Sequence, residues 1–423
     1  MLTQTIRERV ADVLGAGIEG AKLTAKDELM MTYDVTLADG RALMLRMPCS
    51  SGSTPIVESE VATARYISRQ TSIPSPEILA FEKSSDAESP ACYAAYKKPQ
   101  GVCLDAVFPD LSPHQQDLIV VQIARWMVEL FQHRFDKIGS LAEETGAVGP
   151  IVSKLFYDEG RSRLALDRGP FSSARAYYLA CAQRELDACR MLFAQDAPPS
   201  YQRDLEDSRL TVERIAGLLC DLTNRCRGLD DDDLALAPFS LDIHDIGLKD
   251  IFVSPENPTE ILVVTGWDSV STRPLWCCAR LPTWLSLSLS HHNQEARLAS
   301  IFKAEVARLE GLDSIFLRAL DLDDARITLD DLSQYNAFQD GFLLLPALEN
   351  ILATLPGHED FAGLNALLDP TTLPGRVARI NLLTRGSNAM YLAMTPPRSP
   401  LTLAVNDQDT EKVMASDSSV FVT

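Results

Sequence analysis

Two neighbouring segments, LDIHDIGLKDIFV (Leu241–Val253) and EILVVTGWDS (Glu260–Ser269), decide how this chain is interpreted. The first segment places Asp245 after an apolar, strand-like run and Asp250 directly before another such run. The second segment is an apolar strand that ends in polar residues. Alternating apolar runs bounded by polar residues are typical of strands joined by a loop. The two segments therefore predict a strand–loop–strand unit that carries carboxylates.

A further carboxylate follows the second strand. If that strand continues through Trp267, its period of two places Asp268 on the same face as Gly266. We therefore expect the side chains of Asp245, Asp250 and Asp268 to converge on one cleft.

Three earlier segments add strands, a helix and a connector. The segment TYDVTLADGRALMLRMP (Thr32–Pro48) predicts two alternating strands around an Asp-Gly turn. It is followed by a helical segment, ESEVATARYISRQTSIPSPEIL (Glu58–Leu79), and by a strand with a connector, CYAAYKKPQGVCL (Cys92–Leu104). Beyond residue 104, apolar residues recur at helical spacing over long stretches.

Taken together, these segments resemble the aminoglycoside-phosphotransferase-like kinases, especially their fungal branch. The pattern of that family is His-x-Asp-(Leu/Ile)-x-x-x-Asn-Ile-(Leu/Phe)-Val, followed by a strand that ends Ile-Ile-Asp-Trp. The resemblance covers most of residues 30 to 285. It implies an α+β, two-lobe, protein-kinase-like fold with a small mixed lobe (1–96), a hinge (97–101) and a mainly helical lobe (102–390). A flexible tail is expected over 391–423.

The resemblance also assigns roles in the strand–loop–strand unit. It makes Asp245 the catalytic base. The family's Asn position carries Asp250, its His position carries Ile243, and its strand Asp position carries Gly266. A relocated metal site built from Asp250 and Asp268 is one interpretation, because carboxylate oxygens suit Mg²⁺. A cleft that binds metal poorly is the alternative.

Basic residues complete the implied site. Arg46 occupies the position of the basic residue that faces the nucleotide phosphates, and Glu60 is its helix partner. Their ion pair predicts a phosphate clamp, or else a tether of helix to strand. Lys249 is a candidate phosphate ligand or a solvated lysine. We interpret His244, beside the family's His position, as a structural histidine.

Composition limits the partners. The 423 residues carry a net charge of −20, and the sequence pI is about 4.7. A field of this sign repels nucleic acid and anionic membranes, so a phosphate ligand needs a local positive site or a metal ion. No apolar run approaches the roughly eighteen residues of a membrane helix. Nine cysteines without a C-x-x-C motif favour reduced thiols, and we expect a cytoplasmic protein.

Other motifs are absent or weak. The sequence has no G-x-x-x-x-G-K-[ST], G-x-G-x-x-G or G-x-S-x-G pattern. The acidic run Asp230–Asp233 is expected to be a solvated loop rather than a metal motif. His291 and His292 have no Cys or acidic partner at metal-ligand spacing, which argues against zinc.

Three functions remain open. The resemblance implies Mg²⁺- and ATP-dependent phosphorylation of a small-molecule hydroxyl. The changes at Ile243, Asp250 and Gly266 favour a non-catalytic pseudokinase that binds a nucleotide or a partner. A kinase-fold lyase, such as a terpene cyclase acting on a Mg²⁺-bound prenyl diphosphate, would need an apolar pocket, for which Trp276, Trp284 and Leu285 are candidates.

Overall fold

The computed structural model describes eight ranges of the chain: 2–83, 92–193, 202–230, 233–286, 292–322, 324–355, 371–373 and 375–376. The tail expected over 391–423 lies outside these ranges, as do His291, Asp231 and Asp232. The chain forms two compact units. One comprises Met1–Cys181 with Cys226–Asp330, and the other comprises Ala182–Arg225 with Asp331–Thr423.

The first unit begins with a five-stranded antiparallel sheet in the order β1-β2-β3-β5-β4. Its strands are β1 (Ile18–Lys26), β2 (Met30–Leu37), β3 (Ala42–Pro48), β4 (Ile78–Lys83) and β5 (Cys92–Lys97). The predicted hairpin around the Asp-Gly turn is confirmed as β2 and β3. Gly40 closes this turn with a φ of 86°, a conformation that glycine adopts without strain.

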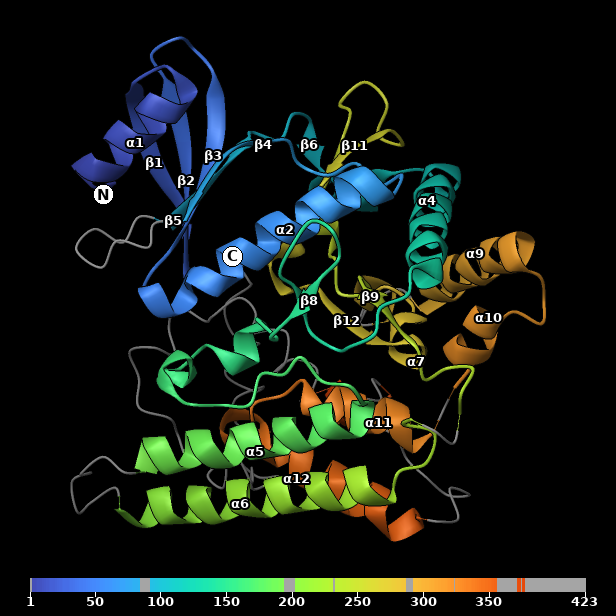
Figure 1. Cartoon of the computed structure of the whole chain (residues 1–423). Coiled ribbons are helices and arrows are strands. Elements are labelled where there is room, and N and C mark those ends of the chain that lie inside the picture. Colours follow the sequence, from blue (N-terminus) through green and yellow to red (C-terminus); the bar gives the residue numbers. More distant parts are fainter. Residues whose placement is uncertain are drawn as a thin grey trace, which may run out of the picture. The chain divides into compact units, whose positions relative to one another are not determined.

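Two helices flank this sheet, α1 (Gln4–Leu14) and α2 (Thr54–Gln70) (Figure 1). The α1 side chains join a core with one face of β2 and β3; this core includes Leu2, Ile6, Val10, Tyr33, Val35, Leu37, Leu43 and Leu45. Because successive residues of a strand point to opposite faces, Arg46 emerges on the face opposite Leu45. That second face is the one that meets Glu60 of α2.

The rest of the first unit contains short strands and helices. Its strands are β6 (Val102–Cys103), β7 (Ser140–Leu141), β8 (Val148–Gly149), β9 (Phe239–Asp242), β10 (Ile251–Val253), β11 (Ile261–Val264) and β12 (Ser271–Pro274). Its helices are α3 (Leu104–Val107), α4 (Pro113–Gln132), α7 (Leu275–Cys278), α8 (Thr283–Ser286), α9 (His292–Glu310) and α10 (Ile315–Leu320). Helix α4 packs along α9. The sheet lobe and the helical lobe confirm the predicted α+β class.

The connector between β5 and β6 depends on a glycine. Gly101 has a φ of 97°, and a Cβ built on it would lie 2.3 Å from the Val253 carbonyl oxygen. The backbones of the connector and of β10 can therefore approach closely only because residue 101 has no side chain. This contact supports the pairing of β6 with β10 in a three-stranded sheet ordered β11-β10-β6.

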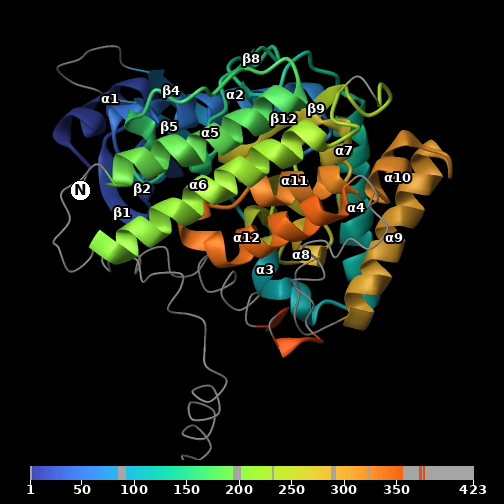
Figure 2. The ribbon, with the colours of Figure 1, turned by 90° about the horizontal axis from the view of Figure 1, so that it is seen from below.

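The second unit is helical. It includes the later part of α5 (Ala174–Phe193), α6 (Gln202–Arg225) and α12 (Ala337–Thr354). Helix α11 (Ala325–Ser333) spans the boundary between the units. Helices α6 and α12 pack side by side (Figure 2). Gly341 of α12 faces Thr211 and Ile215 of α6, and this small residue lets the two helices approach.

The acidic run after α6 differs from the prediction. Its described residues, Asp230 and Asp233, are bound rather than solvated. Asp230 accepts hydrogen bonds from the backbone N–H groups of Ala174 and Arg175, at 2.7 and 3.2 Å, and so caps α5. Asp233 pairs with two arginines of later helices. Within the described ranges, no helix combines the length and the apolar character needed to cross a bilayer.

Candidate functional site

The loop that carries Asp250 is positioned by its pairing with β11. The 3-10 turn η5 (Leu248–Asp250) leads directly into β10, where Ile251 lies opposite Val264. The Thr265 N–H donates to the Asp250 carbonyl oxygen at 2.7 Å. Asp250 therefore lies beside the residues that follow β11.

The chain leaves β11 earlier than expected. The strand ends at Val264, and Gly266 adopts the left-handed region with a φ of 85°. Trp267 and Asp268 belong to a 3-10 turn, η6 (Trp267–Ser269), and the Trp267 indole N–H donates to the Val264 carbonyl at 2.8 Å. The prediction that the strand continues through Trp267 is wrong, because a left-handed residue cannot continue a strand. Asp268 is positioned by a turn and not by strand alternation.

Asp250 and Gly266 fit together in space. A Cβ built on Gly266 would lie 3.0 Å from Asp250 Cγ and 3.2 Å from its Oδ1. The other carboxylate oxygen, Oδ2, accepts from the Gly247 N–H at 3.1 Å. Residues 250 and 266 are therefore sterically coupled. The Asp250 carboxyl occupies space that a side chain at 266 would need.

The charge environment of Asp250 is mixed. Burial raises the pKa of its carboxyl, and the Asp268 carboxylate adds to this rise. The Gly247 N–H, Lys249 and Arg46 act in the opposite direction. The Asp250 carboxyl thus interacts electrostatically with both the Asp268 carboxylate and the Arg46 guanidinium.

Arg46 connects α2 to the η6 turn. Its Nε lies 3.2 Å from Glu60 Oε2, and its Nη2 lies 3.1 Å from Asp268 Oδ2. The predicted ion pair between Arg46 and Glu60 is confirmed. Burial raises the pKa of Glu60 to about 7, against the opposing effect of Arg46. Burial also tends to raise the pKa of Asp268, but the positive charges of Arg46 and Lys154 hold that pKa below its usual range.

Asp245 belongs to a different group of residues. Its side chain is 74% exposed, and its Oδ1 lies 3.5 Å from Nε2 of the buried His244. The other ring nitrogen of His244, Nδ1, lies 2.5 Å from Asp242 Oδ1. Burial opposes the charged imidazolium, but the Asp242 and Asp245 carboxylates outweigh it and raise the pKa of His244. His244 thus joins a buried carboxylate to the exposed Asp245.

The expected convergence of three carboxylates is not a shared metal cluster. Among the described residues, no group of three or more His, Cys, Asp or Glu side chains is arranged to hold a metal ion. Asp250 and Asp268 act on each other and on Arg46. Asp245 instead contacts His244.

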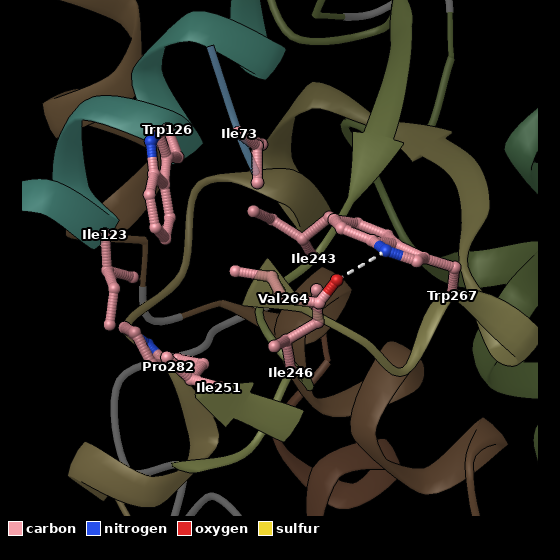
Figure 3. Close-up of a pocket in the computed structure, with 9 residues that line it drawn as sticks. All are labelled: Ile73, Ile123, Trp126, Ile243, Ile246, Ile251, Val264, Trp267 and Pro282. Carbon is pink, nitrogen blue, oxygen red and sulfur yellow. Dashed lines mark hydrogen bonds between the residues drawn. The ribbon is translucent and has the colours of Figure 1, made fainter. Parts of the chain in front are cut away.

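Ile243 lines an apolar cavity of about 20 Å³ (Figure 3). The other lining residues are Ile73, Ile123, Trp126, Ile246, Ile251, Val264, Trp267 and Pro282. A cavity of this size has room for about one water molecule, which needs roughly 10–15 Å³ of free space. Trp276 and Leu285, the candidates for an apolar prenyl pocket, do not line this cavity. Both are buried, and Trp276 stacks on Tyr178. Trp284 packs edge-on against Phe108.

The sequence did not single out every residue near Asp268. Lys154, in the 3-10 turn η3 (Lys154–Phe156), is the second cation after Arg46 that acts on the Asp268 carboxylate. Asp242, the buried partner of His244, was also missed. The spacing of Asp242 and His244, two residues apart at a strand end, was visible in the sequence. Nothing local marks Lys154, because its proximity to the site arises only from the path of the chain.

The strand order, the place of α2 between β3 and β4, and the contact of Arg46 with Glu60 define a kinase-like α+β fold. No family model matches the chain. A subtelomeric hrmA-associated cluster protein of Aspergillus fumigatus, found in two strains, is 28% identical over 152 residues. That match covers 31% of this chain and spans 29% of the length of the curated relative.

Solved structures with a similar fold include three aminoglycoside phosphotransferases. A thermostable mutant of APH(4)-Ia with ADP and hygromycin B is 16% identical, with a TM-score of 0.46 over 84% of this chain and 100% of that chain. The streptomycin–ATP complex of APH(2")-IIa is 11% identical, with a TM-score of 0.46 over 84% and 97%. The GDP complex of aminoglycoside 2'-phosphotransferase-IIIa is 12% identical, with a TM-score of 0.42 over 90% and 96%.

Proposed function

We propose that this chain binds a magnesium-complexed nucleotide and transfers its terminal phosphoryl group to the hydroxyl of a small molecule. The observation that carries this proposal is the position of Arg46, which lies between Glu60 and Asp268 with Asp250 alongside. A largely buried guanidinium that carboxylates from two separate segments hold in place is a preorganised cation, and its planar set of N–H donors suits phosphate oxygens. Arg46 and Glu60 would form the phosphate clamp, and Lys249 would add a second positive charge near Asp250.

The residues present fit a magnesium ion. Mg²⁺ in nucleotide sites is typically bound by one or two carboxylates, with phosphate oxygens and water completing its shell. Asp250 and Asp268 provide two such carboxylates from neighbouring turns, and the low pKa of Asp268 keeps it ionised. When bound, the ion would supply charge stabilisation to the phosphate oxygens.

Asp245 would act as the base. Its carboxylate is exposed and can reach a hydroxyl, as a carboxylate that orients an attacking oxygen must. The ring nitrogen Nε2 of His244, 3.5 Å away, is the neighbour of its Oδ1. The substrate oxygen would attack the terminal phosphorus as its proton passes to Asp245, and the bond from that phosphorus to the bridging oxygen would break, which releases the nucleoside diphosphate. A general base of this kind contributes about 10²- to 10⁴-fold to the rate.

The experiment combines binding with turnover. Calorimetric titration with Mg·ATP, Mg·ADP and a Mg·prenyl diphosphate should show binding of the nucleotides by the parent protein. Asp245→Asn should keep that affinity and lower ATP turnover, followed by ³¹P NMR, about 100-fold or more. Asp313→Asn, at an exposed turn residue, is the matched control and should leave both unchanged. Absence of nucleotide binding by the parent would contradict the proposal.

A non-catalytic nucleotide-binding protein is the second candidate. The observation that favours it is the absence, among the described residues, of a cluster of three or more potential metal ligands. Under this proposal Mg·ADP binds, but ATP turnover is equal in the parent and in Asp245→Asn. The same two measurements therefore distinguish a phosphotransferase from a binding protein. Binding of the prenyl diphosphate alone would favour the lyase instead.

A further inference from the structure

The segment that follows β8 is docked against the end of the five-stranded sheet. The Glu28 carboxylate, in the connection between β1 and β2, accepts hydrogen bonds from the backbone N–H groups of Glu159 and Gly160, at 2.7 and 3.0 Å. On the other side of the same sheet end, a Cβ built on Gly52 would lie 3.3 Å from Ser162 Cβ. The segment therefore spans from the start of β2 to the turn after β3.

This sheet end is the one that carries the clamp. Strands β2 and β3 are antiparallel, with Met30 opposite Pro48 and Thr32 opposite Arg46. Arg46 is thus two residues from the end of β3, and the segment is docked against this end of the sheet. A long side chain of the segment that extends along the strands from this end would approach Arg46.

The docked segment is internally braced. The Arg168 guanidinium donates to the carbonyl oxygens of Phe156, Arg161 and Leu164, at 3.0, 2.8 and 3.2 Å. It also lies over the Tyr157 ring, 4.7 Å from the centroid. A segment held by so many contacts presents its side chains in defined places, which lowers the ordering cost of binding a ligand.

Lys154 is the cation that this segment presents. Its Nζ lies 3.4 Å from Asp27 Oδ2, and the two side chains are 55% and 41% exposed. An exposed pair of this kind contributes little to stability, typically about 0–1 kcal/mol, so the lysine can exchange its partner. Among the cations that act on Asp268, Lys154 follows Arg46.

The charge balance of the site calls for a second cation. Arg46 already faces Glu60 and Asp268, and Asp250 adds a third carboxyl nearby. A phosphate chain that approaches this group meets more negative than positive charge from these four side chains. A lysine ammonium beside these side chains would offset that repulsion directly.

We propose that Lys154 is a phosphate-binding residue of this site, which leaves Asp27 and contacts the phosphate chain of the bound nucleotide. The inference rests on the proposed function, because it assigns a further ligand to the same anion site. Asp27 holds the ammonium near the site while no phosphate is present. The docked segment thereby completes the phosphate site with a residue from outside the strand–loop–strand unit.

The test measures affinity for two probes, Mg·ADP and inorganic tripolyphosphate, by calorimetry at constant ionic strength. Lys154→Met should weaken both about tenfold, equivalent to about 1.4 kcal/mol, and Lys154→Arg should restore most of the affinity. Lys303→Met is the matched control. Lys303, on α9, is 45% exposed and pairs with Asp321 at 2.6 Å, so it is also a partly exposed lysine in an ion pair with an aspartate. The control should bind like the parent. Equal melting temperatures will show that both variants fold.

A second substitution tests the exchange of partners. Asp27→Asn releases Lys154 and should strengthen Mg·ADP binding about two- to threefold, but it should have no such effect in the Lys154→Met background. If Lys154→Met binds both probes as tightly as Lys303→Met does, the inference is overturned while the proposed function stands. If the parent binds neither probe, the proposed function and the inference both fail.

Discussion

The coupling of Gly266 to Asp250 predicts a specific pattern of stabilities. Gly266→Ala introduces two costs. The first is the left-handed backbone, at a φ of 85°, which costs a residue with a Cβ about 1–2 kcal/mol. The second is displacement of the Asp250 carboxyl, whose Cγ would lie 3.0 Å from the new Cβ, and such overpacking costs about 1–3 kcal/mol. We expect a total loss of about 2–5 kcal/mol.

Gly311→Ala isolates the backbone cost. Gly311 follows α9 with a φ of 90°, and a Cβ built on it would meet no atom within 4 Å. This variant should lose only about 1–2 kcal/mol. In an Asp250→Ala background the Gly266 substitution should approach that value, because the carboxyl is gone. The remaining Cβ of residue 250 would still lie 3.3 Å away, so we expect the coupling energy to be about 1–2 kcal/mol.

Urea unfolding followed by tryptophan fluorescence measures these energies. All four tryptophans belong to the first compact unit, and Trp267 is the neighbour of Gly266. The double-mutant cycle isolates the interaction between the two positions. Equal losses for Gly266→Ala and Gly311→Ala, unchanged by Asp250→Ala, would refute the conclusion that the Asp250 carboxyl fills the space beside residue 266.

Two further predictions concern charge. Asp250→Asn restores the letter of the family pattern but removes a charged ligand, so Mg²⁺-dependent ADP binding should weaken about tenfold while metal-free binding stays unchanged; improved binding with Mg²⁺ would show that the carboxylate is not a ligand. Burial, together with the negative charge of Glu28, raises the pKa of the Asp158 carboxyl from 3.8 to about 7. Between about pH 4 and pH 7 the folded protein therefore keeps a proton on Asp158 that the unfolded chain has lost. The contribution of Asp158 to the free energy of unfolding must then fall as the pH rises through this range. Asp158→Asn should lack this fall, and its melting temperature relative to the parent should rise by several degrees across that range; parallel pH profiles would count against a buried Asp158 carboxyl.

Local sequence patterns were enough for the hairpin near the N-terminus, and the resemblance was enough for one ion pair. Alternating residues and an Asp-Gly turn predict the hairpin of β2 and β3, because strand period and turn type depend only on near neighbours. The pairing of Arg46 with Glu60 also followed from the resemblance, since it joins adjacent elements of the small lobe. The α+β class followed from the same resemblance.

The geometry around Asp268 could be decided only by the folded chain. Whether β11 continues past Val264 depends on one φ angle at Gly266, and a glycine permits both outcomes. The position of Lys154 depends on the docking of its segment against Glu28, more than 100 residues away in sequence. Asp268 pairs with Arg46, and Lys154 pairs with Asp27, so each ion pair joins segments that are far apart in the sequence. Only the packing of those segments brings the paired side chains together.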